Sequence, residues 1–417
     1  MFFDKYKERL INFIRKRAFI IILSAVSLIV YIVLGLVTEH IKSTLVDQNL
    51  AERWSEDMRM AQVSIFATED QMIREDDIKK FSYLLEKKLV EAGVSAGDEG
   101  EGDAAKTPRI IDTIDIEDMK KSLEEEEFSI PQKTPLQELY NVAYCAQGKV
   151  TLSFENRTGE NAAAIGVGGD FFLFHPMNFV SGSYFLGDDL MKDKIVIDEE
   201  MAWQLFGSTD IIGQSVTIEG VPHYVSGVVK RNDGMISKAA QQDTSFVYMS
   251  YESLSRYGTI LSGLTESSEI SEDGMTASKG GITCIEVVCP NPVKGLAAKI
   301  CKESLGIKDE FVVVIDNTER FSVFSLLAVL RNFFTRSMWN KAIYYPYWEN
   351  AARGYEDVLA LILLVRLICL LQLILTLVIF TVNSYRHKKW TARGIIQYLS
   401  DKKYDLEVEY KRKKEKL

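Results

Sequence analysis

The chain of 417 residues carries a formal net charge of -10, with 47% hydrophobic and 26% charged residues. This is the composition of a folded protein, and it excludes a disordered or collagen-like chain. The charges are unevenly distributed, because residues 1–17 and 383–417 are rich in Lys and Arg whereas residues 38–357 are strongly acidic. An acidic central segment argues against nucleic acid as a partner.

The first element expected along the chain is a membrane-spanning helix over residues 18–37. This stretch contains no charged residue. At a rise of about 1.5 Å per residue it covers about 30 Å, the thickness of a bilayer core. Arg15 and Arg17 precede the run, and polar residues follow it without a small-residue cleavage site. We therefore expect an uncleaved anchor, not a secretory signal.

The next elements are predicted to form an α/β unit that is later interrupted. Residues 61–67 alternate polar and apolar side chains, which predicts a strand, and apolar residues at helical spacing follow Asp76. Residues 96–135 contain many small and acidic residues and are predicted to be a surface insertion. Its four glutamates at 124–127 favour a solvated helix end over a calcium site, since the loop spacing of calcium sites is missing.

A β-rich lobe is predicted over residues 140–255. Short alternating segments separated by glycines occur at 150–154, 163–167, 194–198, 215–218 and 223–229. A strand at 283–289, a helix at 293–305 and a strand at 310–315 then mirror the first α/β unit. The pattern predicts one split α/β lobe, formed by residues 55–95 and 283–320, with the β-rich lobe inserted.

Residues 321–349 form an aromatic, amphipathic segment. Apolar residues keep helical spacing from Val323 through Phe334 to Met338, and Trp339 and Trp348 follow with three tyrosines between them. Such a segment suits the membrane interface, where aromatic rings lie at headgroup depth. A helix packed on the α/β lobe explains the pattern equally well, and both interpretations stay open.

A second membrane-spanning helix is predicted at residues 358–382. Arg366 and Gln372 lie within it and are candidates for contacts with a partner helix inside the membrane. Alternatively, Arg366 reaches the outer headgroups, because the apolar run is longer than the bilayer core.

Basic clusters outside both spans place the two termini in the cytoplasm under the positive-inside rule. The expected fold is therefore an α+β membrane protein. In it, two transmembrane helices flank a large extracytoplasmic domain made of the split α/β lobe and the inserted β-rich lobe. We expect it in the cell membrane, in contact with the lipid bilayer, with residues 1–17 and 383–417 cytoplasmic.

No motif for catalysis, cofactors or metal binding stands out. The chain lacks a phosphate-binding loop of the GxxxxGK[ST] type, and it lacks HExxH and CxxC. The glycines at 166–169 favour a turn over a phosphate cradle. His175 is close in sequence to Asp170 and Ser181, but a nucleophile elbow is absent. We therefore predict no catalytic residue, cofactor or metal ion.

Four of the five cysteines, Cys145, Cys284, Cys289 and Cys301, lie in the predicted extracytoplasmic domain. Cys284 and Cys289 point to opposite faces of a strand and do not pair easily with each other. A disulfide between Cys289 and Cys301, or free buried thiols, are both compatible with the spacing.

One stretch resembles a known family. Its motifs are, in chain order, Gly-Asp-Phe-Phe at 169–172, Phe-Val-Ser-Gly-Ser-Tyr-Phe at 179–185, Lys-Ile-Val-Ile-Asp-Glu-Glu-Met-Ala at 194–202, Leu-Phe-Gly at 205–207, Ile-Gly-Gln-Ser-Val at 212–216 and Tyr-Val-Ser-Gly-Val-Val at 224–229. The order and content resemble the periplasmic core domain of MacB-like ABC transporter permeases. Gly207 and Gly213 suit tight turns, and Phe206 and Val225 suit a core, so these motif residues are expected to be structural.

The resemblance implies a non-catalytic permease subunit that works with a separate cytoplasmic ABC ATPase, and a second permease subunit or a homodimer as a further partner. Members of this family use ATP to move their outer domains, and they usually have four spans. This chain stops 35 residues after its second span. We therefore keep a second expectation, a membrane-anchored extracellular binding or scaffold module without an ATPase.

The basic residues after the second span fall where the resemblance implies a segment that faces the ATPase. Arg386, Lys388, Lys389 and Arg393 are the candidates for that contact, and anionic lipid is the alternative. The substrate and the direction of transport have no local signature in the sequence.

Overall fold

The computed structural model describes residues 2–54, 59–94, 140–187, 189–231, 234–241, 245–262, 265–266, 268–270, 276–278, 281–336, 343–386, 400 and 402–404. The chain divides into two compact units. One unit comprises Met1–Glu39 with Ile362–Leu417, and the other comprises His40–Leu361. The predicted insertion at 96–135 and most of the basic tail lie outside the described residues.

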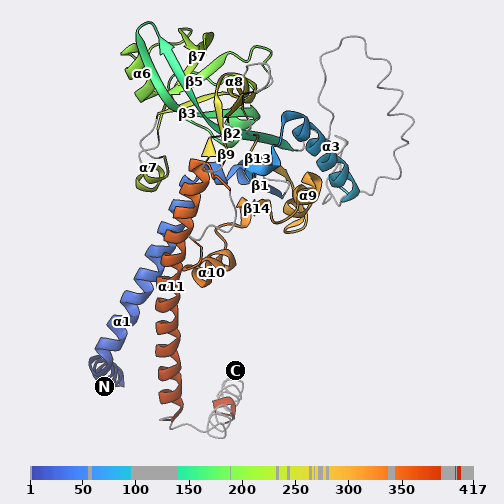
Figure 1. The fold of residues 1–417 in the computed structure, drawn as a ribbon. Helices are drawn as coiled ribbons and strands as arrows, with labels where there is room; N and C mark the ends of the chain where they lie inside the picture. Colours follow the sequence, from blue (N-terminus) through green and yellow to red (C-terminus); the bar gives the residue numbers. More distant parts are fainter. Residues whose placement is uncertain are drawn as a thin grey trace, which may run out of the picture. The chain divides into compact units, whose positions relative to one another are not determined.

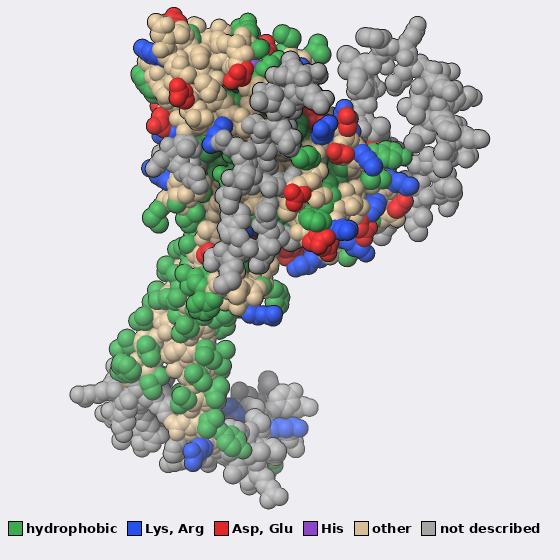
Figure 2. Space-filling model, in the orientation of Figure 1, with side chains coloured by type: hydrophobic (Ala, Val, Ile, Leu, Met, Phe, Trp, Pro, Cys, Tyr) green, Lys and Arg blue, Asp and Glu red, His purple; other side chains and the backbone are tan. Residues whose placement is uncertain are grey.

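Two long helices supply the first unit, α1 (Phe2–Thr44) and α11 (Tyr347–Arg386). Within the described residues, Ala18–Thr44 and Tyr347–Asn383 are long and apolar enough to cross a membrane. Exposed hydrophobic side chains gather on these helices (Figure 2). The spans predicted at 18–37 and 358–382 both fall inside these apolar stretches.

The second unit contains a large sheet in which twelve described strands take part. Its main path is β14 (Val312–Asp316), β1 (Met60–Ala67), β13 (Cys284–Pro290), β2 (Asn141–Phe154), β3 (Arg157–Gly169), β8 (Phe246–Ser250), β5 (Lys194–Asp198), β7 (Val221–Lys230) and β4 (Asn178–Gly182). β6 (Ser215–Ile218), β9 (Thr259–Ser262) and β10 (Thr265–Glu266) pair beside this path, and β11 (Ser268–Ile270) pairs with β12 (Thr276–Ser278).

The sheet runs without interruption through both parts that the sequence pattern separated. β1, β13 and β14 are the strands of the predicted split α/β lobe, and β5 and β7 lie in the predicted β-rich lobe (Figure 1). The long antiparallel hairpin of β2 and β3 connects them, because β2 pairs with β13 on one side and with β3 on the other. The pairs β3–β8 and β5–β7 are parallel.

The strand and helix predictions agree with the structure for the most periodic segments. β5 and β6 have the predicted bounds, and β1 and β7 extend the predicted strands by one to three residues. β4 and β8 lie within the predicted β-rich lobe but were not predicted as strands.

Helices cover the sheet on both faces. The described helical elements are α2 (Leu50–Trp54), α3 (Glu75–Glu91), α5 (Phe171–Phe174), α6 (Glu199–Phe206), α7 (Met235–Gln241), α8 (Tyr251–Tyr257), α9 (Leu296–Leu305), α10 (Val323–Arg331) and α11, with short 3-10 turns η1 (Val46–Gln48), η2 (Glu69–Gln71) and η3 (Asn317–Glu319). α3 packs on α9 and buries Phe81 and Leu85 against β1 residues such as Val63.

Strand β1 is buried along its whole length because neighbours cover both of its faces. Val63 and Ile65 point into the core under α3 and α9, whereas Phe66 belongs to a second core with Trp348 of α11. Since side chains alternate along a strand, Gln62 and Ser64 face the second core. Two polar side chains of β1 are thus buried on the side where α11 begins.

Two sequence interpretations are wrong. The glycines at 166–169 are part of strand β3 and do not form a turn. A side chain at Gly168 would collide with the ring of Tyr144 on β2, so this glycine makes room for an aromatic ring. The helix expected through Phe334 ends at Arg331 and is followed by a turn, because residues such as Asn332 and Thr335 favour a helix weakly. Met338 lies outside the described residues.

The four cysteines of the second unit are buried and free. Cys145 lies directly opposite Cys284 in the β2–β13 pair, and Cys289 and Cys301 share the core under α3 and α9. Burial and the neighbouring thiols raise the pKa of Cys284, and contact with Cys289 together with burial raises the pKa of Cys301. The raised pKa values keep the thiols of Cys284 and Cys301 protonated and weakly reactive.

Replacement of Gly169 by alanine is expected to destabilise the domain more than replacement of Gly213. Both glycines have positive φ angles, +61° and +80°, which cost an alanine about 1–2 kcal/mol. A Cβ at Gly169 would also collide with the carbonyl of Val142, whereas a Cβ at Gly213 meets nothing within 4 Å. The collision adds about 1–3 kcal/mol, measurable by chemical unfolding of the two variants. Equal losses would contradict the assigned clash.

Candidate functional site

Arg320 is the centre of a buried ionic cluster in the second unit. It directly follows η3 and is only 4% exposed. Its Nη1 and Nη2 atoms donate to the two oxygens of Glu349, at 2.7 and 2.8 Å. Its Nε donates to Glu356. Both glutamates belong to the first turns of α11, so one guanidinium holds the beginning of that helix.

The same guanidinium reaches the chain that follows α1. Nη1 of Arg320 lies 3.3 Å from Oε1 of Gln48, the last residue of η1, and 3.3 Å from Oδ1 of Asn317. Gln48 and Asn317 are each 3% exposed. Arg320 therefore connects the segment after α1 with the start of α11. Bidentate guanidinium–carboxylate pairs of this kind also have a defined geometry.

Two further arginines balance the charge of this cluster. Arg353 donates from Nε to Oε1 of Glu349 at 2.8 Å. Arg336 pairs with Glu356, and its Nη1 lies 3.6 Å from Oδ1 of Asp357. Burial lowers the pKa of Arg336, and the charge of Asp357 opposes that effect. Three guanidinium groups thus face three carboxylates, as buried charges require.

A second buried ion cluster surrounds His175, which is 2% exposed. Its Nδ1 lies 3.1 Å from Oδ1 of Asp47, and its Nε2 contacts the carboxylate of Glu286 on β13. The rings of Trp348 and Phe171 lie 4.3 and 4.6 Å from the imidazole, measured between centroids. The site is therefore an imidazole between two carboxylates, with aromatic rings against its face.

The surroundings of His175 favour its charged form. Burial by itself lowers the pKa of His175, but the charge of Glu286 and the hydrogen bonds to Asp47 and Glu286 raise it to about 10. The ring is therefore an imidazolium at neutral pH and donates a proton from each nitrogen.

Hydrogen bonds connect the two clusters. Ser64 of β1 donates to Oε1 of Glu286 at 2.8 Å and accepts from Nδ2 of Asn317 at 2.7 Å. Asn317 in turn accepts from Arg320. We refer to this continuous series as the buried polar chain; its members are Asp47, His175, Glu286, Ser64, Asn317, Arg320 and Glu349. All of them except Asp47, whose side chain is 33% exposed, are shielded from water.

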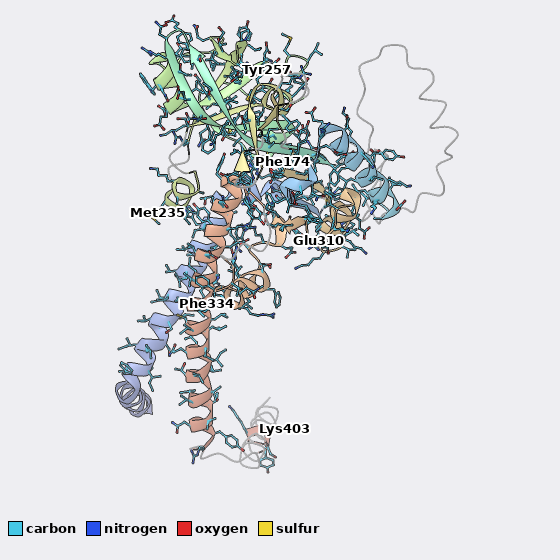
Figure 3. All side chains as sticks on the ribbon, viewed as in Figure 1. Phe174, Met235, Tyr257, Glu310, Phe334 and Lys403 are labelled. Atoms are coloured by element: carbon cyan, nitrogen blue, oxygen red, sulfur yellow. The ribbon has the colours of Figure 1, made fainter. Side chains whose placement is uncertain are left out.

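The buried polar chain joins three parts of the unit. Asp47 follows α1, Ser64 and Glu286 belong to the adjacent strands β1 and β13, and Glu349 lies in the first turn of α11. Phe174, labelled in Figure 3, belongs to the apolar core that surrounds Trp348 at the same place. Such a fully satisfied network in a dry core has few alternative arrangements and gives a rigid connection.

Of the residues predicted for contacts inside the membrane, Arg366 and Gln372 both face α1. The guanidinium of Arg366 lies 4.8 Å from the ring centroid of Tyr31. Nε2 of Gln372 lies 3.5 Å from Oγ of Ser24, which donates to Oγ1 of Thr376 at 3.3 Å. Nε of Arg366 and Oε1 of Gln372 are buried without a hydrogen-bond partner among the described residues. Their contact with a second membrane protein stays a prediction.

Of the residues predicted for an ATPase or lipid contact, only Arg386 is described. It is exposed and ends α11. Lys388, Lys389 and Arg393 lie outside the described residues. The four residues stay candidates on the basis of their charge and position.

The buried polar chain itself was not predicted. His175 was considered with Asp170 and Ser181, but Asp170 accepts from Asn141 and Ser181 donates to the carbonyl of Thr209. The sequence contains one local signal for the ionic cluster around Arg320. Glu349, Arg353 and Glu356 have helical spacing just before an apolar run, which is typical of a charged face that needs partners.

Within the described ranges, His, Cys, Asp and Glu side chains do not gather in groups of three that could hold a metal ion. The arrangement at His175 is that of a buried ion pair, with both ring nitrogens already engaged. Its chemistry is structural: it fixes the position of the residues that it joins.

A family model for the MacB-like periplasmic core domain matches residues 20–270, which is more than half of the chain. The chain belongs to this family. The resemblance inferred from residues 169–229 is thus confirmed. This MacB-like protein is a membrane protein in which two apolar helices flank a mixed α/β domain, and its family is of the ABC-transporter permease type.

A curated relative of the MacB-like protein is the macrolide export ATP-binding/permease protein MacB of Chromobacterium violaceum. The two are 36% identical over 75 residues, or 18% of this chain. The alignment covers 12% of the relative's length, so most of that protein lies outside it.

Two solved structures are similar to the MacB-like protein at low identity. The periplasmic region of MacB from Actinobacillus actinomycetemcomitans is 14% identical, with 67% of this chain and 94% of that chain covered and a TM-score of 0.33. The extracellular domain of the noncanonic ABC-type transporter YknZ from Gram-positive bacteria is 16% identical, with 61% and 99% covered and a TM-score of 0.32.

Proposed function

We propose that this chain is a non-catalytic permease-type subunit that transmits motion between a cytoplasmic ABC ATPase and its own extracytoplasmic domain. The observation that carries the proposal is the buried polar chain. It ties the segment after α1 and the first turns of α11 to the adjacent strands β1 and β13. A chain built for anchoring alone does not require both helix ends to be held by buried charges.

The physical basis is the cost of breaking such contacts. A shift of α11 relative to β1 would separate Glu349 from Arg320 and leave buried charges unpaired, which costs several kcal/mol. The helix and the strands therefore move together, or change between discrete arrangements. Force applied to either helix by an ATPase would reach the sheet through Asp47 and Glu349.

The cytoplasmic part of the proposal rests on charge and family. Basic residues at both chain ends favour a cytoplasmic location for the termini. The curated relative's name combines an ATP-binding and a permease function in one protein. For this chain we propose a separate ATPase, with Arg386, Lys388, Lys389 and Arg393 as its contact, and a second permease subunit or a second copy that meets Arg366 and Gln372.

The expected result of affinity purification is stoichiometric recovery of an ABC ATPase with the detergent-solubilised full chain, identified by mass spectrometry. Reversal of charge at Lys388 and Lys389 to glutamate should abolish this recovery, because the contact is expected to be electrostatic. The matched control reverses Lys402 and Lys403, farther along the same basic tail. Recovery of envelope proteins alone would favour the membrane-anchored scaffold instead.

A further inference from the structure

An exposed apolar surface lies on α10 and the turn that follows it. We name it the α10 surface; its residues are Val323, Phe324, Leu327, Phe333 and Phe334. Phe324 is 81% exposed and Phe334, labelled in Figure 3, is 89% exposed. The opposite side of α10 is anchored in the domain, because Leu326 is buried. Helix α10 thus has apolar side chains both on the side that packs on the domain and on the exposed side.

Water is an unfavourable solvent for this surface. Isolated apolar residues on a protein surface are ordinary, but three phenylalanines and their aliphatic neighbours on one short segment form a patch. Burial of a phenylalanine side chain contributes about 1.5–3 kcal/mol, so the patch favours an apolar environment.

The end of the α10 surface is held at the beginning of the second apolar run. Arg336 follows Phe334 by two residues and pairs with Glu356 and Asp357 of α11. The apolar run of α11 begins at the next residue, Val358. These contacts lie within one unit, so their geometry does not depend on how the two units are arranged.

The charge of the segment fits a bilayer surface. Residues 320–336 contain no acidic residue. Two of their three arginines, Arg320 and Arg336, are paired with carboxylates of α11, so Arg331 is the one that can meet lipid. Arg331 is exposed at the end of α10. Basic residues beside phenylalanine and leucine are typical of helices that lie in the headgroup layer, where arginine meets lipid phosphate.

We propose that the α10 surface is inserted into the headgroup layer of the membrane on the side of the extracytoplasmic domain. The occupant is lipid, because Arg336 attaches the end of this surface to Glu356 and Asp357, directly before the exposed apolar side chains Val358 and Leu361 of α11. The contact holds the domain at a defined height and restrains rotation of the domain about α11. It does not depend on the ATPase proposed above.

The sequence of residues 321–349 fits either the membrane interface or packing on the domain, and the two parts of this segment differ in burial. Ile343 and Trp348 are buried in the second core, and Tyr345 and Tyr347 pack against it. Phe324 and Phe334 are exposed. The proposal therefore assigns the membrane to the first part of the segment only.

Lipid contact can be measured by fluorescence quenching in nanodiscs that contain the full chain. Single cysteines replace Phe324 or Phe334 in a Cys369→Ala background and carry an environment-sensitive fluorophore. The matched control is Leu190→Cys, at a side chain 94% exposed in the loop before β5. With spin-labelled lipid in the bilayer, the probes at 324 and 334 should lose most of their fluorescence, and the probe at 190 should keep it.

Two outcomes would overturn the proposal. Probes at 324 and 334 that keep their fluorescence like the probe at 190 would place the surface in water or against a protein. A disulfide between two chains through the introduced cysteine at 334, without quenching by lipid, would identify a second copy as the occupant. Neither outcome affects the recovery of an ATPase, so the two proposals are tested separately.

Discussion

Replacement of Arg320 by alanine is expected to lower the free energy of unfolding by about 3–5 kcal/mol. The substitution removes the bidentate partner of Glu349, which is 1% exposed, and one of the two partners of Glu356, which is 8% exposed. Arg353 and Arg336 remain, but each contacts one glutamate only. The hydrogen bonds that the buried carboxylates lose are not replaced by water. Chemical unfolding of the purified full chain, followed by tryptophan fluorescence, measures the change.

A surface ion pair provides the matched control. Lys302 and Asp309 are 2.7 Å apart, but their side chains are 43% and 76% exposed. Lys302→Ala should therefore change the stability by only about 0–1 kcal/mol. Arg320→Lys keeps the charge but loses the bidentate geometry, so its loss of stability should lie between those of Arg320→Ala and Lys302→Ala. A loss for Arg320→Ala as small as that of the control would contradict the assigned network.

A substitution in the same cluster connects its stability with the proposed function. Glu349→Gln preserves the shape of the side chain and removes its charge, so it weakens the contact with Arg320 while the fold is kept. If the buried polar chain transmits motion, this variant should still bind the ATPase and should couple to it less well.

Replacement of His175 by glutamine is expected to destabilise the domain strongly at pH 6 and progressively less as the pH rises to 10. The folded chain raises the pKa of His175 from 6.5 to about 10. A raised pKa means that the folded state binds the proton more tightly than the unfolded state. The stabilisation is fully present below pH 6.5 and is lost as the pH passes through about 10.

The size of this effect follows from the same linkage between protonation and stability. Between pH 6.5 and about 10, the contribution of His175 to the free energy of unfolding falls by about 1.4 kcal/mol per pH unit. Other groups also titrate in this range. The difference between the wild-type protein and His175→Gln isolates the contribution of the imidazole, and it is measured by chemical unfolding at several pH values.

His223 is the matched control for this experiment. It is also buried, but burial lowers its pKa, and only the hydrogen bond to the carbonyl of Val221 and the charge of Asp193 oppose that effect. Its contribution is therefore present at higher pH and is lost as the pH falls. The stability difference between the wild-type protein and His223→Gln should therefore not decrease between pH 6.5 and 10. If it decreased as much as the difference between the wild-type protein and His175→Gln, the carboxylates beside His175 would not be the cause of the pH dependence.

Local sequence patterns were sufficient for the elements with strong periodicity. The two long apolar runs predicted the long helices, the alternation at 61–67 predicted β1, and the spacing of Phe81, Leu85 and their neighbours predicted α3. Each of these signals comes from side chains a few residues apart, so the sequence contains it directly. The family motifs at 169–229 are also local and were recognised for that reason.

The tertiary structure alone decided which residues form the buried polar chain. Asp47, His175, Glu286 and Arg320 are far apart in sequence, and the oppositely charged partner of each lies in another segment of the chain. The sequence shows polar residues at 62 and 64 within a strand. It does not show that a second core covers them, because that core forms only when β1, β13 and the start of α11 meet.

The sequence by itself thus determined the class of the protein: two apolar helices around an acidic α/β domain, with motifs of one family. Only the tertiary structure decided that β2 and β3 unite the predicted lobes in one sheet, and that buried charges attach both helix ends to it. The physical reason is range. Periodicity and turn preferences act over a few residues, whereas pairing of strands and burial of charge depend on contacts between distant segments.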